Sequence, residues 1–262
     1  KRVIGISPLV IDVLNLVPSL EHHYQAYGEF SEALNDYKES RLVEAAELKE
    51  YKALLKIEDP YSYRDRFTMP KFIVNAAGDQ YFLPDSSQFY FGNLKGENRL
   101  SYLPNGSHYI LDNAPRITDP GSVVNILNSW IMSVIQDVPR PNVTWTFPDA
   151  NTINLKLDSP VPDGTTVKVW EGVNSSARDF RYDTLGSNGF KVTQTLTDDG
   201  TGLFVAKVSQ PAAGKGYRAY MVQVRIPSAA TPVITAAGVP KPLFVFSSPV
   251  RVTPDTYPFP GP

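Results

Sequence analysis

Asp79 and His108 are the two residues whose types and spacing best fit a hydrolytic site. Each comes shortly after an apolar segment, Asp79 after residues 71–75 and His108 after residues 100–103. A carboxylate that accepts a hydrogen bond from imidazole Nδ1 fixes the ring tautomer, which leaves Nε2 able to take a proton from a serine hydroxyl. In hydrolases with the serine on a strand-to-helix elbow, the acid precedes the histidine in the chain, as it does here. The two residues therefore predict the acid and base of a serine hydrolase.

The serine that this pair would activate has no candidate in the sequence. No Gly-x-Ser-x-Gly pentapeptide occurs among the 262 residues. Ser7 and Ser107 both lack the glycine pattern that a strand-to-helix elbow requires. We therefore do not expect a complete triad within this chain, and the nucleophile would belong to another segment.

Asp79 and His108 each have an ordinary structural interpretation as well. An aspartate after a glycine often holds a turn or caps the following helix, and spacing alone favours this interpretation of Asp79 as much as the catalytic one. His108 ends an Asn-Gly-Ser-His sequence, where a turn histidine is common. Taken as a pair, the two residues favour catalysis.

Other residues with binding chemistry give weaker signals. His22 and His23 are adjacent, so on a helix they point in different directions, and no third metal ligand stands at a suitable spacing. We expect no metal and no cofactor. Nine aromatic residues could line an apolar substrate pocket, although core packing is the favoured interpretation. They are Tyr24, Tyr27, Phe30, Tyr37, Tyr81, Phe82, Phe89, Tyr90 and Phe91.

The first part of the chain, residues 1–138, has the pattern of a parallel sheet covered by helices. Apolar runs at 3–6, 71–75 and 100–103 predict buried parallel strands. Helical spacing predicts helices over 29–57, in two segments broken around Ser40, and over 85–94 and 121–136. This alternation indicates an α/β fold, which we interpret as the C-terminal half of an α/β-hydrolase domain.

The composition changes at Pro139-Arg140-Pro141, where we place a domain boundary. Residues 139–262 contain short alternating runs at 143–147, 152–157, 166–170, 202–208 and 217–226, with turn residues between them. They predict a small antiparallel β-sandwich of the immunoglobulin or fibronectin kind.

Composition also limits the partners and the compartment. The net charge of −2 and the scattered basic residues disfavour nucleic acid and anionic lipid as partners. The absence of cysteine excludes disulfides and thiolate metal sites. Sequons at Asn105, Asn142 and Asn174 would accept glycans on a secretory route. The first residues fit neither a signal peptide nor a natural start, so we expect the chain to begin inside a longer precursor.

Several stretches resemble the PhoPQ-activated pathogenicity-related protein family. They comprise residues 2–12, 22–24, 59–66, 69–85, 103–108, 169–170, 177–181 and 248–259. The resemblance implies an α/β-hydrolase fold and a nucleophile directly upstream of the first strand. Asp79 in Gly-Asp-Gln-Tyr-Phe and His108 in Asn-Gly-Ser-His match the family's acid and histidine positions. The resemblance also implies export from the cell, and one member of the family is an extracellular signal that limits proliferation.

Two functions from different classes follow. The first is a secreted serine peptidase or esterase whose serine lies in an N-terminal half of the same precursor or in another chain. The alternative is a non-catalytic extracellular signalling protein or binding module built on the same scaffold, with an extracellular receptor as its partner. A sheet that begins at residues 1–12 would expose an edge, so we expect either a missing partner segment or an oligomer interface there. We expect no membrane span.

Overall fold

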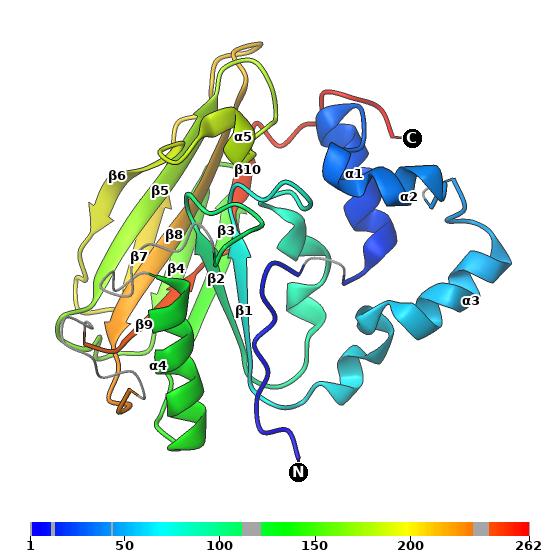
Figure 1. Cartoon of the computed structure of the whole chain (residues 1–262). Helices are drawn as coiled ribbons and strands as arrows, with labels where there is room; N and C mark the ends of the chain where they lie inside the picture. The colour runs from blue at the N-terminus through cyan, green and yellow to red at the C-terminus, as the bar shows by residue number, and fades with distance from the viewer. Residues whose placement is uncertain (1, 12–13, 43, 112–121, 233–240, 262) are drawn as a thin grey trace.

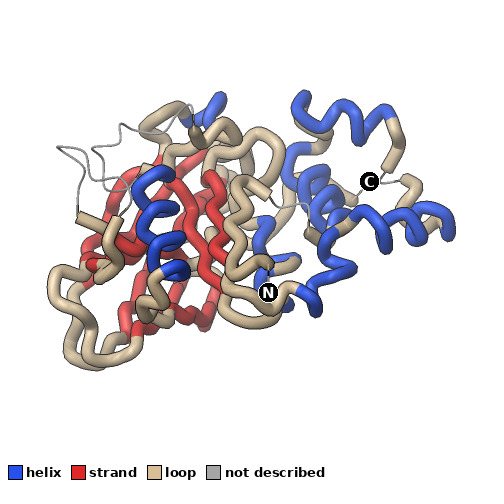
Figure 2. Tube along the Cα trace, turned by 60° about the horizontal axis from the view of Figure 1, so that its bottom comes forward, coloured by secondary structure: helices blue, strands red, loops and turns tan. Residues whose placement is uncertain are grey.

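The computed structural model describes residues 2–11, 14–42, 44–111, 122–232 and 241–261. The fold is a mixed α/β arrangement of one parallel strand pair and two antiparallel sheets (Figure 1). Figure 2 shows the strands gathered on one side of the molecule and most of the helices on the other. The α/β class predicted from the sequence is therefore confirmed.

The parallel pair positions both candidate catalytic residues. Strand β1 (Lys71–Ala76) pairs with β2 (Asn98–Leu103), with Lys71 opposite Asn98. All six residues of β1 are buried, which explains its continuous apolar run. Because parallel strands end at the same edge of a sheet, the loops that follow β1 and β2 lie next to each other.

The strand predicted at 3–6 does not form as expected. Ile6 and Leu9 make only isolated parallel bridges to β1, opposite Lys71 and Val74. Val3 and Ile4 are exposed. Pro8 lies between the two bridges and has no N–H to donate, which prevents a regular ladder there.

The helical region before β1 begins earlier than predicted. Helix α1 (Leu16–Tyr27) precedes the predicted range of 29–57 and ends at Gly28, whose φ is 75°. Within that range the structure has α2 (Asn35–Glu39) and α3 (Lys49–Glu58), so the break around Ser40 is confirmed. Short 3₁₀ helices occupy Glu32–Leu34 and Pro60–Arg66.

The helix predicted over 85–94 is wrong. Two 3₁₀ helices, Ser86–Phe89 and Phe91–Asn93, stand in its place. Tyr90 separates them with a φ of −137°, and its side chain is fully buried. Packing of the Tyr90 ring into the core outweighs the local preference for a continuous helix.

The helix predicted over 121–136 is present as α4 (Val123–Ile135). Its N-terminus is capped by the Ser122 hydroxyl, which accepts from the Asn125 N–H at 3.3 Å. Gly121 lies outside the described residues. Trp130 of α4 packs on Phe72 of β1, with ring centroids 5.7 Å apart.

All five strands predicted after residue 139 are present, and three more join them. The strands are β3 (Val143–Asp149), β4 (Thr152–Leu157), β5 (Thr166–Asn174), β6 (Phe190–Leu196), β7 (Leu203–Lys207), β8 (Tyr217–Pro227), β9 (Leu243–Ser247) and β10 (Arg251–Thr253). One sheet has the order β3-β4-β7, and the other has the order β10-β8-β5-β6, with β9 also paired to β8. A single turn of helix, α5 (Tyr182–Leu185), precedes β6.

One hydrophobic core spans the predicted boundary at 139. Phe72 and Trp130 from the first part belong to the same buried cluster as Leu155, Val222 and Phe246 from the antiparallel sheets. At the edge of the parallel pair, the β2 N–H of Tyr102 donates to the Ser247 hydroxyl at 2.9 Å. The antiparallel sheets therefore cover β2 directly.

Candidate active site

The structure brings Asp79 and His108 into direct contact. The two carboxylate oxygens of Asp79 lie 3.1 and 2.9 Å from Nδ1 of His108. The Asp79 side chain is 4% exposed and the imidazole is 25% exposed. The acid is therefore enclosed, while the histidine reaches the surface.

Asp79 holds a turn as well as the imidazole. Its Oδ1 accepts hydrogen bonds from the backbone N–H groups of Tyr81, at 2.7 Å, and Phe82, at 3.1 Å. The neighbouring Gln80 accepts from the His108 N–H through its side-chain oxygen at 3.0 Å. Asp79 therefore holds the turn and contacts the histidine at the same time, because its carboxylate accepts from two backbone N–H groups and also faces Nδ1 of His108.

Two glycines allow the loops after β1 and β2 to approach each other. The Gly78 N–H donates to the Gly106 carbonyl at 3.0 Å. A Cβ atom at position 78 would stand 2.8 Å from that carbonyl oxygen and 3.0 Å from the Tyr182 nitrogen. Glycine at position 78 is therefore required for the close backbone approach that puts Asp79 beside His108.

The second nitrogen of His108 is available. Within the described residues, Nε2 makes no hydrogen bond, whereas Nδ1 is held by Asp79. Tyr81 covers part of the ring, with centroids 4.1 Å apart, and Phe82 and Tyr109 lie at 6.2 and 5.9 Å. A neutral imidazole in this position has the proton on Nδ1 and a free lone pair on Nε2, which is the state of a general base.

Neither serine considered from the sequence is hydrogen-bonded to the His108 ring. The Ser7 hydroxyl donates to the Phe72 carbonyl at 2.7 Å. Ser107 is 2% exposed, and its oxygen accepts from the Tyr109 N–H at 3.2 Å. In the part of the chain that the structure describes, no serine hydroxyl is hydrogen-bonded to Nε2 of His108.

His22 belongs to a buried ionic cluster that sequence reasoning missed. Its Nε2 lies 2.8 Å from Asp85 and its Nδ1 lies 3.0 Å from the Tyr257 hydroxyl. The other oxygen of Asp85 accepts from Arg178 at 2.6 Å. Burial alone would raise the pKa of Asp85, but Arg178 and His22 hold that pKa far below its ordinary value. All four residues lie in the resemblance stretches 22–24, 69–85, 177–181 and 248–259, and this is the signal that could have found the cluster.

His23 faces a different environment from His22. Its Nε2 accepts from the Ser31 N–H at 3.0 Å, and the Ser31 hydroxyl donates to the Gln80 carbonyl at 2.9 Å. Helix α1 thereby supports the loop that carries Asp79. Burial of the ring, together with the charges of Arg181 and His22, lowers the pKa of His23 from 6.5 to about 3. Across the described ranges, no group of three or more His, Cys, Asp or Glu side chains could hold a metal ion.

Acid is expected to destabilise the protein through His23. Between pH 6.5 and about 3, the unfolded chain binds a proton at His23 that the folded protein does not bind. As the pH is lowered through this range, the free energy of unfolding therefore falls by about 1.4 kcal/mol per pH unit. Above pH 6.5 this loss of stability is absent. His23→Gln keeps an acceptor for the Ser31 N–H but does not titrate in this range. In urea denaturation, the loss of unfolding free energy between about pH 7 and about pH 5 should therefore be smaller in His23→Gln than in the native protein. An equal loss in the two proteins would contradict this.

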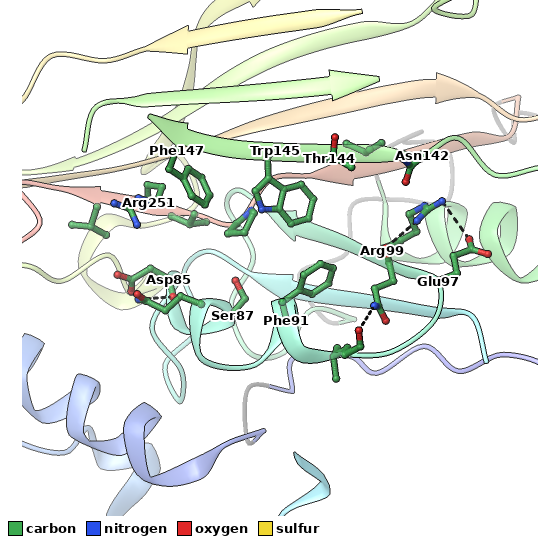
Figure 3. A pocket seen from close by; sticks show the side chains of 18 of the residues that line it. Asp85, Ser87, Phe91, Glu97, Arg99, Asn142, Thr144, Trp145, Phe147 and Arg251 are labelled. Atoms are coloured by element: carbon green, nitrogen blue, oxygen red, sulfur yellow. Dashed lines mark hydrogen bonds and ion pairs between the residues drawn. The ribbon is translucent and has the colours of Figure 1, made fainter. Parts of the chain in front are cut away.

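A separate cavity of about 850 Å³ lies away from the Asp79–His108 pair. Figure 3 shows Phe91 on one wall and Trp145 and Phe147 on the opposite wall. Neither Asp79 nor His108 lines it. Of the nine aromatic residues considered for a substrate pocket, Phe91 alone lines this cavity, whereas Tyr81 and Phe82 surround His108.

The three sequons differ in accessibility. Asn105 exchanges two hydrogen bonds with the Phe190 backbone, at 3.0 and 2.8 Å. Asn174 is buried and donates to the Asp179 carbonyl at 2.8 Å. Asn142 is exposed. In this fold, Asn142 is the sequon whose amide a glycosyl transferase could reach.

Family membership follows from sequence comparison. The model of the PhoPQ-activated pathogenicity-related protein family matches residues 1–181, and the chain belongs to this family. A curated relative, the autocrine proliferation repressor protein A of Dictyostelium discoideum, is 31% identical over 280 residues. The match covers 98% of this chain and 53% of the relative, so the chain spans about half the length of that protein. No solved structure matches significantly. No helix in the described ranges has the length and apolar character needed to cross a membrane.

Proposed function

We propose that this chain supplies the acid and the general base of a secreted serine hydrolase, a peptidase or an esterase. The observation that carries the proposal is the contact between Asp79 and Nδ1 of His108, which leaves Nε2 free at the surface. The nucleophilic serine would come from a segment outside residues 1–262, in the same polypeptide or in a second chain. Two carboxylate contacts and a fixed tautomer are what such a base needs before a serine is delivered to it.

In the proposed reaction, the serine oxygen attacks the carbonyl carbon of an ester or peptide while its proton passes to Nε2 of His108. The Asp79 carboxylate accepts from Nδ1–H and stabilises the imidazolium that forms. The carbon–leaving-group bond then breaks, and His108 gives the proton to the leaving oxygen or nitrogen. Water repeats the sequence on the acyl-enzyme and restores the serine.

Three further expectations belong to this proposal. The parallel pair with its covering helices and the two antiparallel sheets are consistent with half of an α/β-hydrolase domain followed by a β-sandwich. The bridged segment at Ile6 and Leu9 is the edge where we expect the nucleophile-bearing segment to join. We also propose that the protein is secreted and carries a glycan at the exposed Asn142.

A fluorophosphonate probe tests the catalytic function directly, because it reacts covalently with activated serines. We expect the native protein that contains this chain to be labelled on a serine outside residues 1–262. His108→Ala should abolish labelling, whereas Asp163→Asn, at an exposed aspartate in the turn before β5, should not. Absence of labelling in the native protein, or labelling that survives His108→Ala in a folded variant, would overturn the proposal.

The second candidate is a non-catalytic extracellular signal. It is favoured by the 31% identical relative, whose name describes an autocrine repressor of proliferation. On this hypothesis, conditioned medium containing the protein slows proliferation of the producing cells, and His108→Ala leaves that effect intact. Loss of growth repression with His108→Ala, at equal secretion and thermal stability, would favour catalysis instead.

A further inference from the structure

Three consecutive residues each contact a different part of His108. The Asp79 carboxylate lies 2.9 Å from Nδ1, and the Gln80 side-chain oxygen accepts from the His108 N–H at 3.0 Å. The Tyr81 ring lies against the imidazole, with centroids 4.1 Å apart and an interplanar angle of 36°. No other pair of aromatic rings in the described part of the chain is closer. One face of the candidate base is therefore covered by Tyr81.

The Tyr81 ring is itself held in place from several directions. Its backbone N–H donates to Oδ1 of Asp79 at 2.7 Å. Its side chain packs against the small buried cluster that includes Leu20 of α1. Its hydroxyl is hydrogen-bonded to Tyr109, whose ring meets the imidazole edge-on at a centroid distance of 5.9 Å. The surface that Tyr81 offers to the imidazole is therefore fixed by its own packing.

The contact with Asp79 does not by itself fix the plane of the imidazole. The terminal torsion of a histidine side chain has broad minima, so a partner at Nδ1 alone lets the ring rock about that contact. The imidazole is 25% exposed and is not enclosed on all sides. An aromatic ring packed on one face restricts this rocking and keeps the Nε2 lone pair in one direction. Proton transfer depends on that direction, because donor and acceptor must be aligned at hydrogen-bond distance.

The same stacking also acts on the charge that develops in the proposed reaction. When His108 takes the serine proton, its ring becomes a cation that lies over the electron-rich face of Tyr81. A cation within about 6 Å of a tyrosine centroid is attracted by the ring quadrupole, and the 4.1 Å separation lies within this range. The neutral imidazole gains less from this attraction. Only an interaction that strengthens toward the transition state raises the rate of the chemical step.

We propose that Tyr81 is a positioning residue for His108, which orients the base and stabilises its protonated form. This inference rests on the proposed hydrolase function and adds a residue to its site. Tyr81 acts through the imidazole and not through contact with the substrate. A purely structural Tyr81 would instead affect the stability of the loop and leave the labelling rate of the folded protein unchanged.

The kinetics of fluorophosphonate labelling test this role in the native protein that contains this chain. Tyr81→Leu keeps an apolar side chain but removes the aromatic face. It should lower the maximal labelling rate about tenfold and leave the half-saturating probe concentration unchanged. Tyr81→Phe keeps the face and should retain most of the rate. Tyr63→Leu is the matched control and should label at the native rate, because the Tyr63 ring lies under Arg66 and not against His108.

Thermal midpoints identify any variant that does not fold. If Tyr81→Leu does not fold, Tyr81→Met replaces it, because methionine fills irregular space and also lacks an aromatic face. Three results would overturn the positioning role while His108→Ala still abolishes labelling. They are an unchanged maximal rate in the folded Leu or Met variant, an equal loss in Tyr81→Phe, and a change confined to the half-saturating concentration. A native protein that is not labelled, or labelling that survives His108→Ala, overturns the proposed function and the role of Tyr81 together.

Discussion

Asp79→Asn is expected to lower kcat for the proposed ester or peptide hydrolysis by about 10⁴ in the native protein, with little change in fold. The asparagine oxygen can still accept from the Tyr81 and Phe82 N–H groups, which now bond to Oδ1 of Asp79. Its amide nitrogen, however, donates to Nδ1 of His108 in place of accepting. The imidazole proton then moves to Nε2, and the ring can no longer take a proton from serine. Steady-state kinetics with a p-nitrophenyl ester measure the loss.

Two comparisons separate this effect from misfolding. Asp163→Asn makes the same chemical change at an exposed site and should leave kcat unchanged. The thermal midpoint of Asp79→Asn should stay close to that of the native protein, because both turn hydrogen bonds persist. Full activity in Asp79→Asn would show that the contact with His108 is structural only.

Arg178→Met is expected to destabilise the fold by about 3–5 kcal/mol. Arg178 and His22 side chains are each 1% exposed, and the Asp85 side chain is 6% exposed, so water cannot replace the lost partner. Removing the guanidinium leaves the Asp85 carboxylate buried with His22 alone. Methionine keeps most of the volume, which limits the contribution of a cavity. Denaturation in guanidinium chloride at neutral pH measures the change.

The pH dependence of this loss identifies its cause. The pKa of Asp85 is held far below its ordinary value of 3.8, so its ion pair contributes fully above that value and is lost as the pH falls through the folded-state pKa. The deficit of Arg178→Met should therefore shrink in acid. The double variant Arg178→Met/Asp85→Asn should recover part of the stability, because no unpaired charge remains. A pH-independent deficit that Asp85→Asn does not relieve would indicate lost packing instead.

The strands that the sequence predicted are those with a clear burial pattern. Strand β1 is buried throughout and contains the apolar run Phe72-Ile73-Val74 because it is covered on both faces, and β4 alternates because one face is buried. Strand β6 escaped prediction because Phe190 is its one fully buried residue among polar neighbours such as Lys191 and Thr193. Helix α1 also escaped, since it has no charged residue in its first or last turn and carries Pro18 in its first turn.

The candidate site also combines residues that local sequence patterns predict with residues that only tertiary packing brings together. Asp79 and His108 were predictable because chain order and the ends of two apolar runs place both at one sheet edge. The cluster of His22, Asp85 and Arg178 joins residues separated by 63 and 93 positions, and no local pattern relates them. The 850 Å³ cavity likewise joins β2 to β3 and β10, so its lining exists only after tertiary packing.

The shared core has a consequence for how this protein can be inherited and engineered. Phe72 and Trp130 pack in one cluster with Phe246, and the edge of β2 is closed by Ser247. Recombination at residue 139 would separate the two halves of this core and expose the apolar side chains of both. We therefore expect the segments before and after residue 139 to be inherited together. Chimeras with other members of the family should therefore retain residues 71–253 as one block. New sequence is better accommodated in exposed turns such as Asp199–Gly200, where the backbone carries no core side chain.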